Sequence, residues 1–279
     1  MDQPKVCLSI AGLDPSGGAG TITDVKTFSA FGCFATAAIT SLTFQNTVEV
    51  VGAAHQSAET VSRQIEPVLR DFEISAVKTG MLPTAEIIET VANLVRDHGL
   101  KNIVVDPVVR STSGFDLIDN TALQTLIKML FPLADVITPN IPEAERISGI
   151  AISDESDIEA AARQIQSMGG RNVLIKGGHL AIADFKKGNN DENRNARDYL
   201  FLGADMYIFE AEYINTTSTH GTGCTLSSAI AANLALGNDL KTAIDIAKKF
   251  VTEAIRTAPG LGHGHSPLNI QPSMPKPAR

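Results

Sequence analysis

Residues 74–107 read ISAVKTGMLPTAEIIETVANLVRDHGLKNIVVDP, and this stretch decides the fold class. Its two ends are short apolar runs rich in β-branched residues, and each run closes in a turn signal. Between them, residues 85–99 carry apolar side chains at helical spacing. A strand, a helix and a second strand in this order predict two parallel strands joined by a right-handed crossover.

The same alternation extends along most of the chain. Further apolar runs occupy residues 5–12, 35–46, 135–140 and 172–178, and helical patterns occupy 120–131, 157–170 and 239–258. Continuous apolar strands alternating with helices indicate an α/β protein with a mostly parallel sheet covered on both faces. Two shorter runs, 197–202 and 206–214, leave no room for a helix between them and predict antiparallel or edge strands.

We expect a single domain over residues 1–279, since no domain boundary is evident. The polar segment 184–197 has the composition of a flexible loop. The tail 262–279 is too rich in proline and glycine for regular structure, and its GHGH sequence (His263, His265) is more typical of a flexible tail than of a metal site.

Composition narrows the class of protein. The chain has 43% hydrophobic residues, enough for a buried core, and a net charge of −8, which argues against nucleic acid as a main partner. Its three cysteines form no CxxC pair, so neither a zinc site nor a disulfide framework is indicated. We find no signal peptide and no apolar run of about 20 residues that could span a membrane, and we therefore expect a cytoplasmic protein.

Polar residues follow the predicted strands. In open α/β sheets, ligands bind outside the carboxyl ends of the strands. These ends carry AGLDPSGGAG, Gln45-Asn46, KTGM, Asp106-Pro107, TPNIPEAE, KGGH with Lys176, and THGTGC. Each has an ordinary alternative: Asp106 can cap a turn, Asn140 and Glu143 can begin a helix, Lys176 can be a solvated loop residue, and Cys224 a small buried residue. Their convergence on one edge favours a site.

The set indicates phosphoryl transfer. The glycine turn before residues 222–235 offers free N–H groups and a helix dipole to a phosphate. Lys176 offers a cation, while Asp106 and Glu143 can hold hydrated Mg²⁺. The sequence has no Gly-Lys dipeptide, so a Walker A loop is excluded, and it has no GxGxxG.

Eight motifs in order resemble one known family. AGLDPSGGAG, LTFQNT, VKTGML, VVDPVV, TPNIPEAE, KGGHL, THGTGCTLSSAIAANLALG and GLGHGHSPLN are similar to those of the hydroxymethylpyrimidine/phosphomethylpyrimidine kinases of thiamine biosynthesis. The resemblance implies a ribokinase-like three-layer α/β/α fold and a homodimer. It also implies ATP- and Mg²⁺-dependent phosphorylation of 4-amino-5-hydroxymethyl-2-methylpyrimidine, and then of its monophosphate to the diphosphate.

The resemblance also assigns site residues. The pyrimidine pocket falls on Gly12, Asp24, Gln45, Met81 and Val108, and the positions for ATP and its metal fall on Asn140, Glu143 and Lys176. The anion hole falls on Gly221, Thr222, Gly223 and Cys224. Related sugar kinases have aspartate as catalytic base where this chain has Cys224. A helix N-terminus can lower a cysteine pKa, so Cys224 is expected either to accept the alcohol proton, which we favour, or only to orient the alcohol.

The Gln45 amide, with donors and an acceptor, can meet the exocyclic amine and a ring nitrogen together. Arg110 departs from the apolar residue usual at its position, and either brings charge to the phosphate or faces solvent. Two alternatives stay open: a pyridoxal or pyridoxine kinase of the same fold, and a non-catalytic pyrimidine-binding or regulatory protein. The intact phosphate motif argues against the second.

Overall fold

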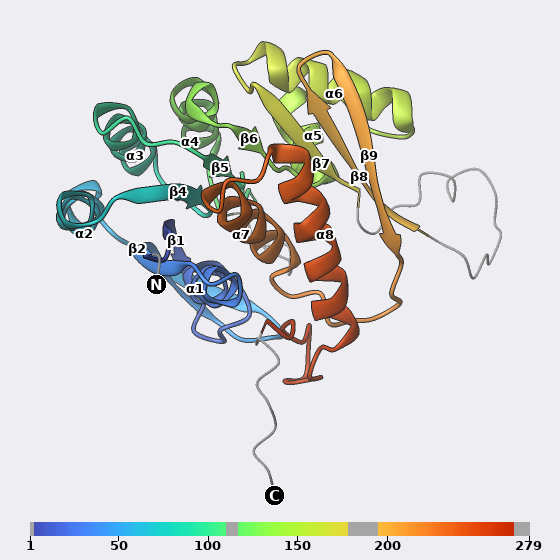
Figure 1. Ribbon diagram of the computed structural model, residues 1–279, viewed down its shortest axis with the longest axis horizontal. Coiled ribbons are helices and arrows are strands. Elements are labelled where there is room, and N and C mark those ends of the chain that lie inside the picture. The colour runs from blue at the N-terminus through green and yellow to red at the C-terminus, as the bar shows by residue number, and fades with distance from the viewer. Residues whose placement is uncertain (1–2, 110–116, 178–194, 271–279) are drawn as a thin grey trace, which may run out of the picture.

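One nine-stranded sheet organises the molecule (Figure 1). The computed structural model describes residues 3–109, 117–177 and 195–270. The strand order is β3-β2-β1-β4-β5-β6-β7-β8-β9. The strands are β1 (Val6–Leu13), β2 (Phe34–Gln45), β3 (Val50–His55), β4 (Ile74–Thr79), β5 (Ile103–Val105), β6 (Val136–Ile137), β7 (Asn172–Lys176), β8 (Asn195–Leu202) and β9 (Asp205–Glu212).

The six strands from β2 to β7 in this order run parallel, while β3, β8 and β9 are antiparallel. The predicted mostly parallel sheet is therefore confirmed, as is the antiparallel pair at one edge. The chain places β2 on one side of β1 and β4 on the other. Such a reversal of winding opens a crevice at the carboxyl ends of the strands, where ligands bind.

Helices cover both faces of the sheet. They are α1 (Gly20–Ala30), α2 (Ala58–Asp71), α3 (Ala85–Asp97), α4 (Asn120–Thr125), α5 (Ile141–Ser148), α6 (Glu155–Ser167), α7 (Thr222–Ala235) and α8 (Leu240–Arg256). On one face, Phe28, Ile230 and Ile244 join α1, α7 and α8 in one apolar core. On the other, α2 to α6 share a second core (Figure 1). The three-layer α/β/α prediction is confirmed.

Local sequence explains where several helices begin and end. The Thr84 and Asp154 side chains accept hydrogen bonds at the N-termini of α3 and α6, which is the usual role of these residue types. The helix predicted over 120–131 is interrupted, because a π-helical turn, Leu126–Leu130, leads into a short 3-10 turn that contains Pro132. After α7, Gly237 adopts φ +90°, a left-handed conformation that suits glycine.

Three elements were not predicted. Helix α1 has the sequence GTITDVKTFSA, whose β-branched residues and lack of an apolar stripe hide it. Helix α2 carries Pro67, and strand β3 is largely exposed. The predicted loop 184–197 is wrong at its end, because residues 195–197 already belong to β8; the rest of it lies outside the described residues.

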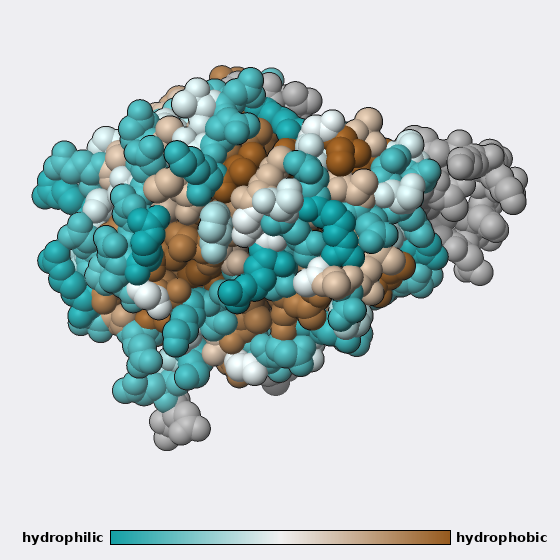
Figure 2. Space-filling view, turned by 90° about the horizontal axis from the view of Figure 1, so that it is seen from above, coloured by the Kyte–Doolittle hydropathy of each residue, from teal (hydrophilic) through white to brown (hydrophobic). Residues whose placement is uncertain are grey.

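Hydrophilic residues cover much of the face seen in Figure 2, and apolar residues show in the hollows between them. In the described part of the chain, no helix is both long enough and apolar enough to cross a membrane.

Candidate functional site

A cavity of about 610 Å³ opens at the carboxyl ends of the parallel strands. Twelve of the thirteen predicted site residues line it, brought there by the ends of six strands, the segments that follow them and the start of α7. They are Gly12, Gln45, Met81, Asp106, Val108, Asn140, Glu143, Lys176, Gly221, Thr222, Gly223 and Cys224. The expectation that these strand ends meet at one edge is therefore confirmed.

The N-terminus of α7 forms one wall of the cavity. Gly221 precedes the helix with φ +81°, and a Cβ atom there would lie 1.8 Å from the carbonyl oxygen of Gly18. Only glycine fits this position. No side chain caps the first turn of α7 and no acidic residue lies in it. Its N–H groups and the helix dipole are thus available to an anion.

Lys176 lies between two buried carboxylates. Its Nζ atom donates to Oδ1 of Asp106 at 2.8 Å and lies 4.0 Å from Oε2 of Glu143. Oδ1 of Asp106 also accepts a hydrogen bond from Thr138, and Oδ2 accepts one from Ser227 of α7. The predicted cation and the two predicted carboxylates therefore form one cluster on the cavity wall.

Neighbouring charges and burial have opposing effects on the pKa values of Asp106, Glu143 and Lys176. Although burial works against it, the Lys176 and Lys78 ammonium groups hold the pKa of Asp106 below its usual value. Burial raises the pKa of Glu143 to about 7, opposed by Lys176 and reinforced by the Asp106 charge. Despite burial, the two carboxylates raise the pKa of Lys176. The cluster thus holds a fixed cation, a fixed anion and one acid that titrates near neutral pH.

Asn140 and Glu143 also begin α5. The Asn140 side chain accepts from the Glu143 N–H at 2.9 Å, and the Glu143 carboxylate accepts from the Asn140 N–H at 2.8 Å. This capping box is the ordinary alternative considered for the pair, and the structure confirms it. Both residues nevertheless line the cavity, so the box fixes Glu143 where it faces the cluster.

Cys224, in the first turn of α7, lies near charges of both signs. Burial raises the pKa of its thiol to about 11, the Lys78 ammonium opposes this rise, and the carboxylates of Asp24 and Asp106 add to it. The backbone N–H of Gly20, at the start of α1, also acts to lower this pKa. The expectation that the helix N-terminus lowers this pKa is wrong, because removal of the thiol from water outweighs the dipole.

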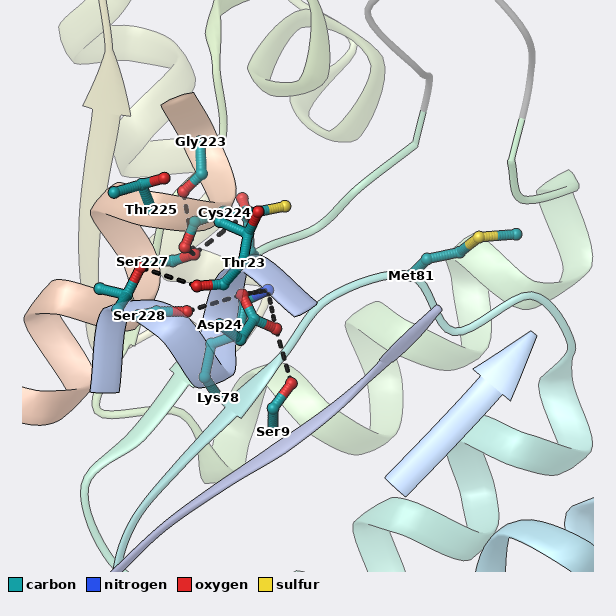
Figure 3. A network of polar contacts seen from close by, with 12 residues as sticks. Ser9, Thr23, Asp24, Lys78, Met81, Gly223, Cys224, Thr225, Ser227 and Ser228 are labelled. Carbon is teal, nitrogen blue, oxygen red and sulfur yellow. Dashed lines mark hydrogen bonds and ion pairs between the residues drawn. The ribbon is translucent and has the colours of Figure 1, made fainter. Parts of the chain in front are cut away.

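Asp24 is the one predicted site residue that does not line the cavity. It is fully buried, and both carboxylate oxygens bond the Lys78 ammonium at 2.9 Å. Ser9 and Ser228 donate to the same carboxylate (Figure 3). The structure thus places Asp24 behind the cavity wall, and its assignment to the pyrimidine pocket stays a prediction.

Two features of the site were missed from the sequence. Lys78 lines the cavity although its side chain is 0% exposed. A lysine inside the apolar strand ISAVKT was the available signal. The second is a pair between His220 and Asp14, with 2.7 Å between Nε2 and Oδ2. It joins the loop after β1 to the turn before α7, and both residues lie inside motifs quoted above, AGLDPSGGAG and THGTGC.

Four of the predicted pyrimidine residues line the same cavity. Gly12 packs against Met81, since a Cβ atom on Gly12 would lie 3.1 Å from the Met81 sulfur. Gln45 ends β2, and within the described residues its amide has no protein hydrogen-bond partner. A cavity with an apolar wall and one free amide suits a small heteroaromatic ring.

The segment 262–270 has neither helix nor strand, yet it packs against the site. The His265 N–H donates to the Thr47 carbonyl at 2.8 Å, and its ring bonds Thr219. Within residues 3–109, 117–177 and 195–270, no group of three or more His, Cys, Asp or Glu side chains could hold a metal ion. Arg110 lies outside the described residues.

Comparison with protein families finds a match to phosphomethylpyrimidine kinase over residues 14–269. The chain is 43% identical over 270 residues to the hydroxymethylpyrimidine/phosphomethylpyrimidine kinase of Haemophilus influenzae, covering 96% of this chain and 97% of that one. It is 44% identical over 262 residues to a thiamine biosynthesis bifunctional protein of Geobacter sulfurreducens, covering 94% of this chain and 51% of that longer one.

Solved structures give the same fold. A phosphomethylpyrimidine kinase of Clostridium difficile superposes with a TM-score of 0.76 at 39% identity, covering 90% of this chain and 99% of that one. The pyridoxal kinase of Staphylococcus aureus in complex with AMP-PCP gives a TM-score of 0.84 at 30% identity, covering 96% of this chain and 94% of that one.

Proposed function

The chain belongs to the phosphomethylpyrimidine kinase family, and we propose that the cavity at the carboxyl edge of its sheet is the active site. The protein is a kinase that uses ATP to phosphorylate 4-amino-5-hydroxymethyl-2-methylpyrimidine, and then its monophosphate, in thiamine biosynthesis. The observation that carries the placement is the uncapped N-terminus of α7 beside the Lys176–Asp106 pair.

The transferred phosphoryl group would lie on the N–H groups of Gly221 to Cys224. A loose transition state spreads negative charge over its equatorial oxygens, and fixed N–H donors with a nearby cation stabilise that charge. Lys176 supplies the cation, since it is nearly buried and carries a raised pKa. Asn140, which leads into α5 on the same wall, would contact the nucleotide.

Mg²⁺ fits the two carboxylates of this wall. The ion prefers oxygen ligands and keeps several waters, so one or two carboxylates together with the ATP phosphates suffice. Asp106 and Glu143 both face the cavity and both interact with the single Lys176 ammonium. The ion would neutralise phosphate charge as transfer proceeds. We propose Asp106 and Glu143 as its protein ligands.

The pyrimidine ring would bind between Gly12, Met81 and Val108, with the Gln45 amide bonded to the exocyclic amine and a ring nitrogen. In this pose the hydroxymethyl group would point to Cys224. Cys224 would take the hydroxyl proton as the oxygen attacks phosphorus, a role that requires the thiolate. Because the resting thiol has a pKa of about 11, this base is present at neutral pH only in a small fraction.

We also propose a homodimer, one domain over residues 1–279 and a cytoplasmic location. One continuous sheet supports the single domain. Phe44 of β2 is 53% exposed and Val51 of β3 is 70% exposed, which supports an interface at this edge of the sheet. Phe44→Asp should then convert the dimer to a monomer in sedimentation measurements, and a monomeric unmodified protein would contradict the proposal.

The substrate assignment is tested by ATP consumption with the aminopyrimidine, its monophosphate, pyridoxal and pyridoxine in parallel. We expect turnover with the first two. Pyridoxal kinase is the second candidate, because the Staphylococcus aureus structure shares the fold at 30% identity. Higher kcat/KM for pyridoxal than for the aminopyrimidine would favour it.

A further inference from the structure

A buried ion pair lies directly under the proposed active site. Lys78 comes from β4 and Asp24 from α1, and both side chains are 0% exposed. Ser9 of β1 and Ser228 of α7 donate to the same carboxylate at 2.6 and 2.7 Å. Figure 3 shows this network beside Cys224. Four elements that form the floor of the cavity therefore hold one ammonium group in place.

The ammonium also reaches the cavity. Lys78 is among the residues that line it, and a Cβ atom on Gly80 would lie 2.9 Å from its Nζ atom. The absence of a side chain at Gly80 thus leaves room for the charge. An ammonium has three donors, and Asp24 accepts from Nζ with both oxygens. Within the described residues, Lys78 has no other hydrogen-bond acceptor.

We propose that Lys78 is a positioning residue for the kinase reaction: held by Asp24, its ammonium supplies the positive charge that favours the thiolate of Cys224. The thiol first loses its proton to solvent. As the acceptor oxygen bonds to the γ-phosphorus, its proton passes to the sulfur, and the bond from phosphorus to the departing ADP oxygen breaks. The inference rests on the proposed role of Cys224 and gives a cause for the base that the sequence alone did not supply.

Four charged groups act on the sulfur. Lys78 on β4 and Lys176 on β7 favour the thiolate, while Asp24 on α1 and Asp106 after β5 oppose it. Burial raises the pKa of Cys224 more than any of them, and Lys78 is the largest opposing influence. The two members of the buried pair therefore act on the same sulfur with opposite signs. Removing Lys78 and removing Asp24 should therefore change the reactivity of Cys224 in opposite directions, whereas a loss of structure would change it in the same direction.

The test is the rate at which iodoacetamide alkylates Cys224 without ATP, followed by peptide mass spectrometry between pH 7 and 10. Only the thiolate reacts. Lys78→Met should slow alkylation at pH 8 by about tenfold, the effect of one pKa unit. Asp24→Asn should accelerate it severalfold, because a repelling charge is removed. The double variant Asp24→Asn/Lys78→Met loses both charges and should lie between the two single variants.

The double variant is also a control for misfolding. Lys78→Met alone leaves a buried Asp24 without its counter-charge, whereas the double variant buries no unpaired charge. A matched control is Lys248→Met, which breaks another buried lysine–aspartate pair, 2.6 Å from Asp198, and should leave the Cys224 rate within twofold. Wild-type rates in Lys78→Met, or a rate in Asp24→Asn that is unchanged or lower, would overturn the inference. Alkylation needs no kinase activity, so its result is independent of whether Cys224 proves to be the base.

Discussion

The Nζ atom of Lys176 lies 2.8 Å from Oδ1 of Asp106, so the ends of β7 and β5 meet through an ion pair on the cavity wall. The same ammonium lies 4.0 Å from Glu143. A bound triphosphate would attract Lys176, and the carboxylates would then need another cation. The binding of ATP should therefore favour the binding of Mg²⁺ at Asp106 and Glu143.

The first prediction concerns that metal. Glu143→Gln keeps the hydrogen bond that begins α5, because glutamine also serves in a capping box. It removes one charged ligand, so the Mg²⁺ concentration for half-maximal rate should rise severalfold. The measurement is a Mg²⁺ titration of kcat at saturating ATP. An unchanged titration would remove Glu143 from the metal site.

The second prediction concerns stability and pH in the metal-free protein. The pKa of Glu143 rises from 4.5 to about 7 on folding, so the folded state holds this proton more tightly than the unfolded state. The resulting stabilisation is complete below pH 4.5 and is lost as pH rises through about 7. The free energy of unfolding of Glu143→Gln, relative to wild type, should therefore increase over this window by on the order of 3 kcal/mol. A difference that stays flat between these pH values would contradict the assignment.

The third prediction concerns the pyrimidine. Gln45→Ala leaves polar groups of the bound ring unpaired, at a cost of roughly 1–3 kcal/mol. The KM for the aminopyrimidine should rise by the corresponding factor, while the KM for ATP stays nearly constant. Steady-state kinetics with each substrate varied in turn provide the check. Equal increases in both would show that Gln45 does not contact the pyrimidine.

The fourth prediction concerns Cys224. Serine replaces the thiol by a hydroxyl that does not ionise near neutral pH. General-base catalysis typically accelerates a reaction by about 10²–10⁴-fold. Cys224→Ser should lower kcat by that order with little change in KM. In wild type, kcat should rise with pH above neutrality, because the thiol titrates at about 11. A serine variant within threefold of wild type would leave the N–H groups of α7 as the main catalyst.

The fifth prediction compares three glycines. Gly221→Ala meets the Gly18 carbonyl at 1.8 Å and should abolish activity by displacing the start of α7. Gly223→Ala meets the end of the Lys176 side chain at 3.1 Å and the Asp106 carboxylate at 3.8 Å, so it should fold normally and lose kcat. Gly237→Ala, with no atom within 4 Å and φ +90°, is the control: it should cost about 1 kcal/mol of stability and retain kcat. Equal activity of all three variants would exclude a tight turn at Gly221.

Most of the alternation of strands and helices was predictable from the sequence, because the buried strands form continuous apolar runs and several covering helices, such as α3 and α8, carry an apolar stripe. The convergence of Lys176, Asp106 and Glu143 was predictable for the same reason, since parallel strands bring their carboxyl ends to one edge. Helix α1 was not, because its buried side includes Thr23, Asp24 and Thr27, which no apolar pattern marks.

The roles of Asp24 and Lys78 could not be separated by sequence. A charged residue on a helix beside a ligand loop can point to the ligand or beneath it, and only the register between α1 and β4 decides. Here that register pairs the two charges at 2.9 Å. The raised pKa of Cys224 was equally hidden, because the degree of burial depends on the whole fold.

The place of α7 in the topology has a consequence for how the protein matures during synthesis. The helix packs on the sheet in the same core as Cys7 of β1 and Ala76 of β4, yet it begins only at Thr222, far beyond both along the chain. A nascent chain can therefore pair β1, β2 and β4 while the anion-binding turn is still untranslated. Until that turn emerges, Asp24 and Lys78 lack Ser228 and the overlying helix, so the buried ion pair of the folded protein can be completed only late in synthesis.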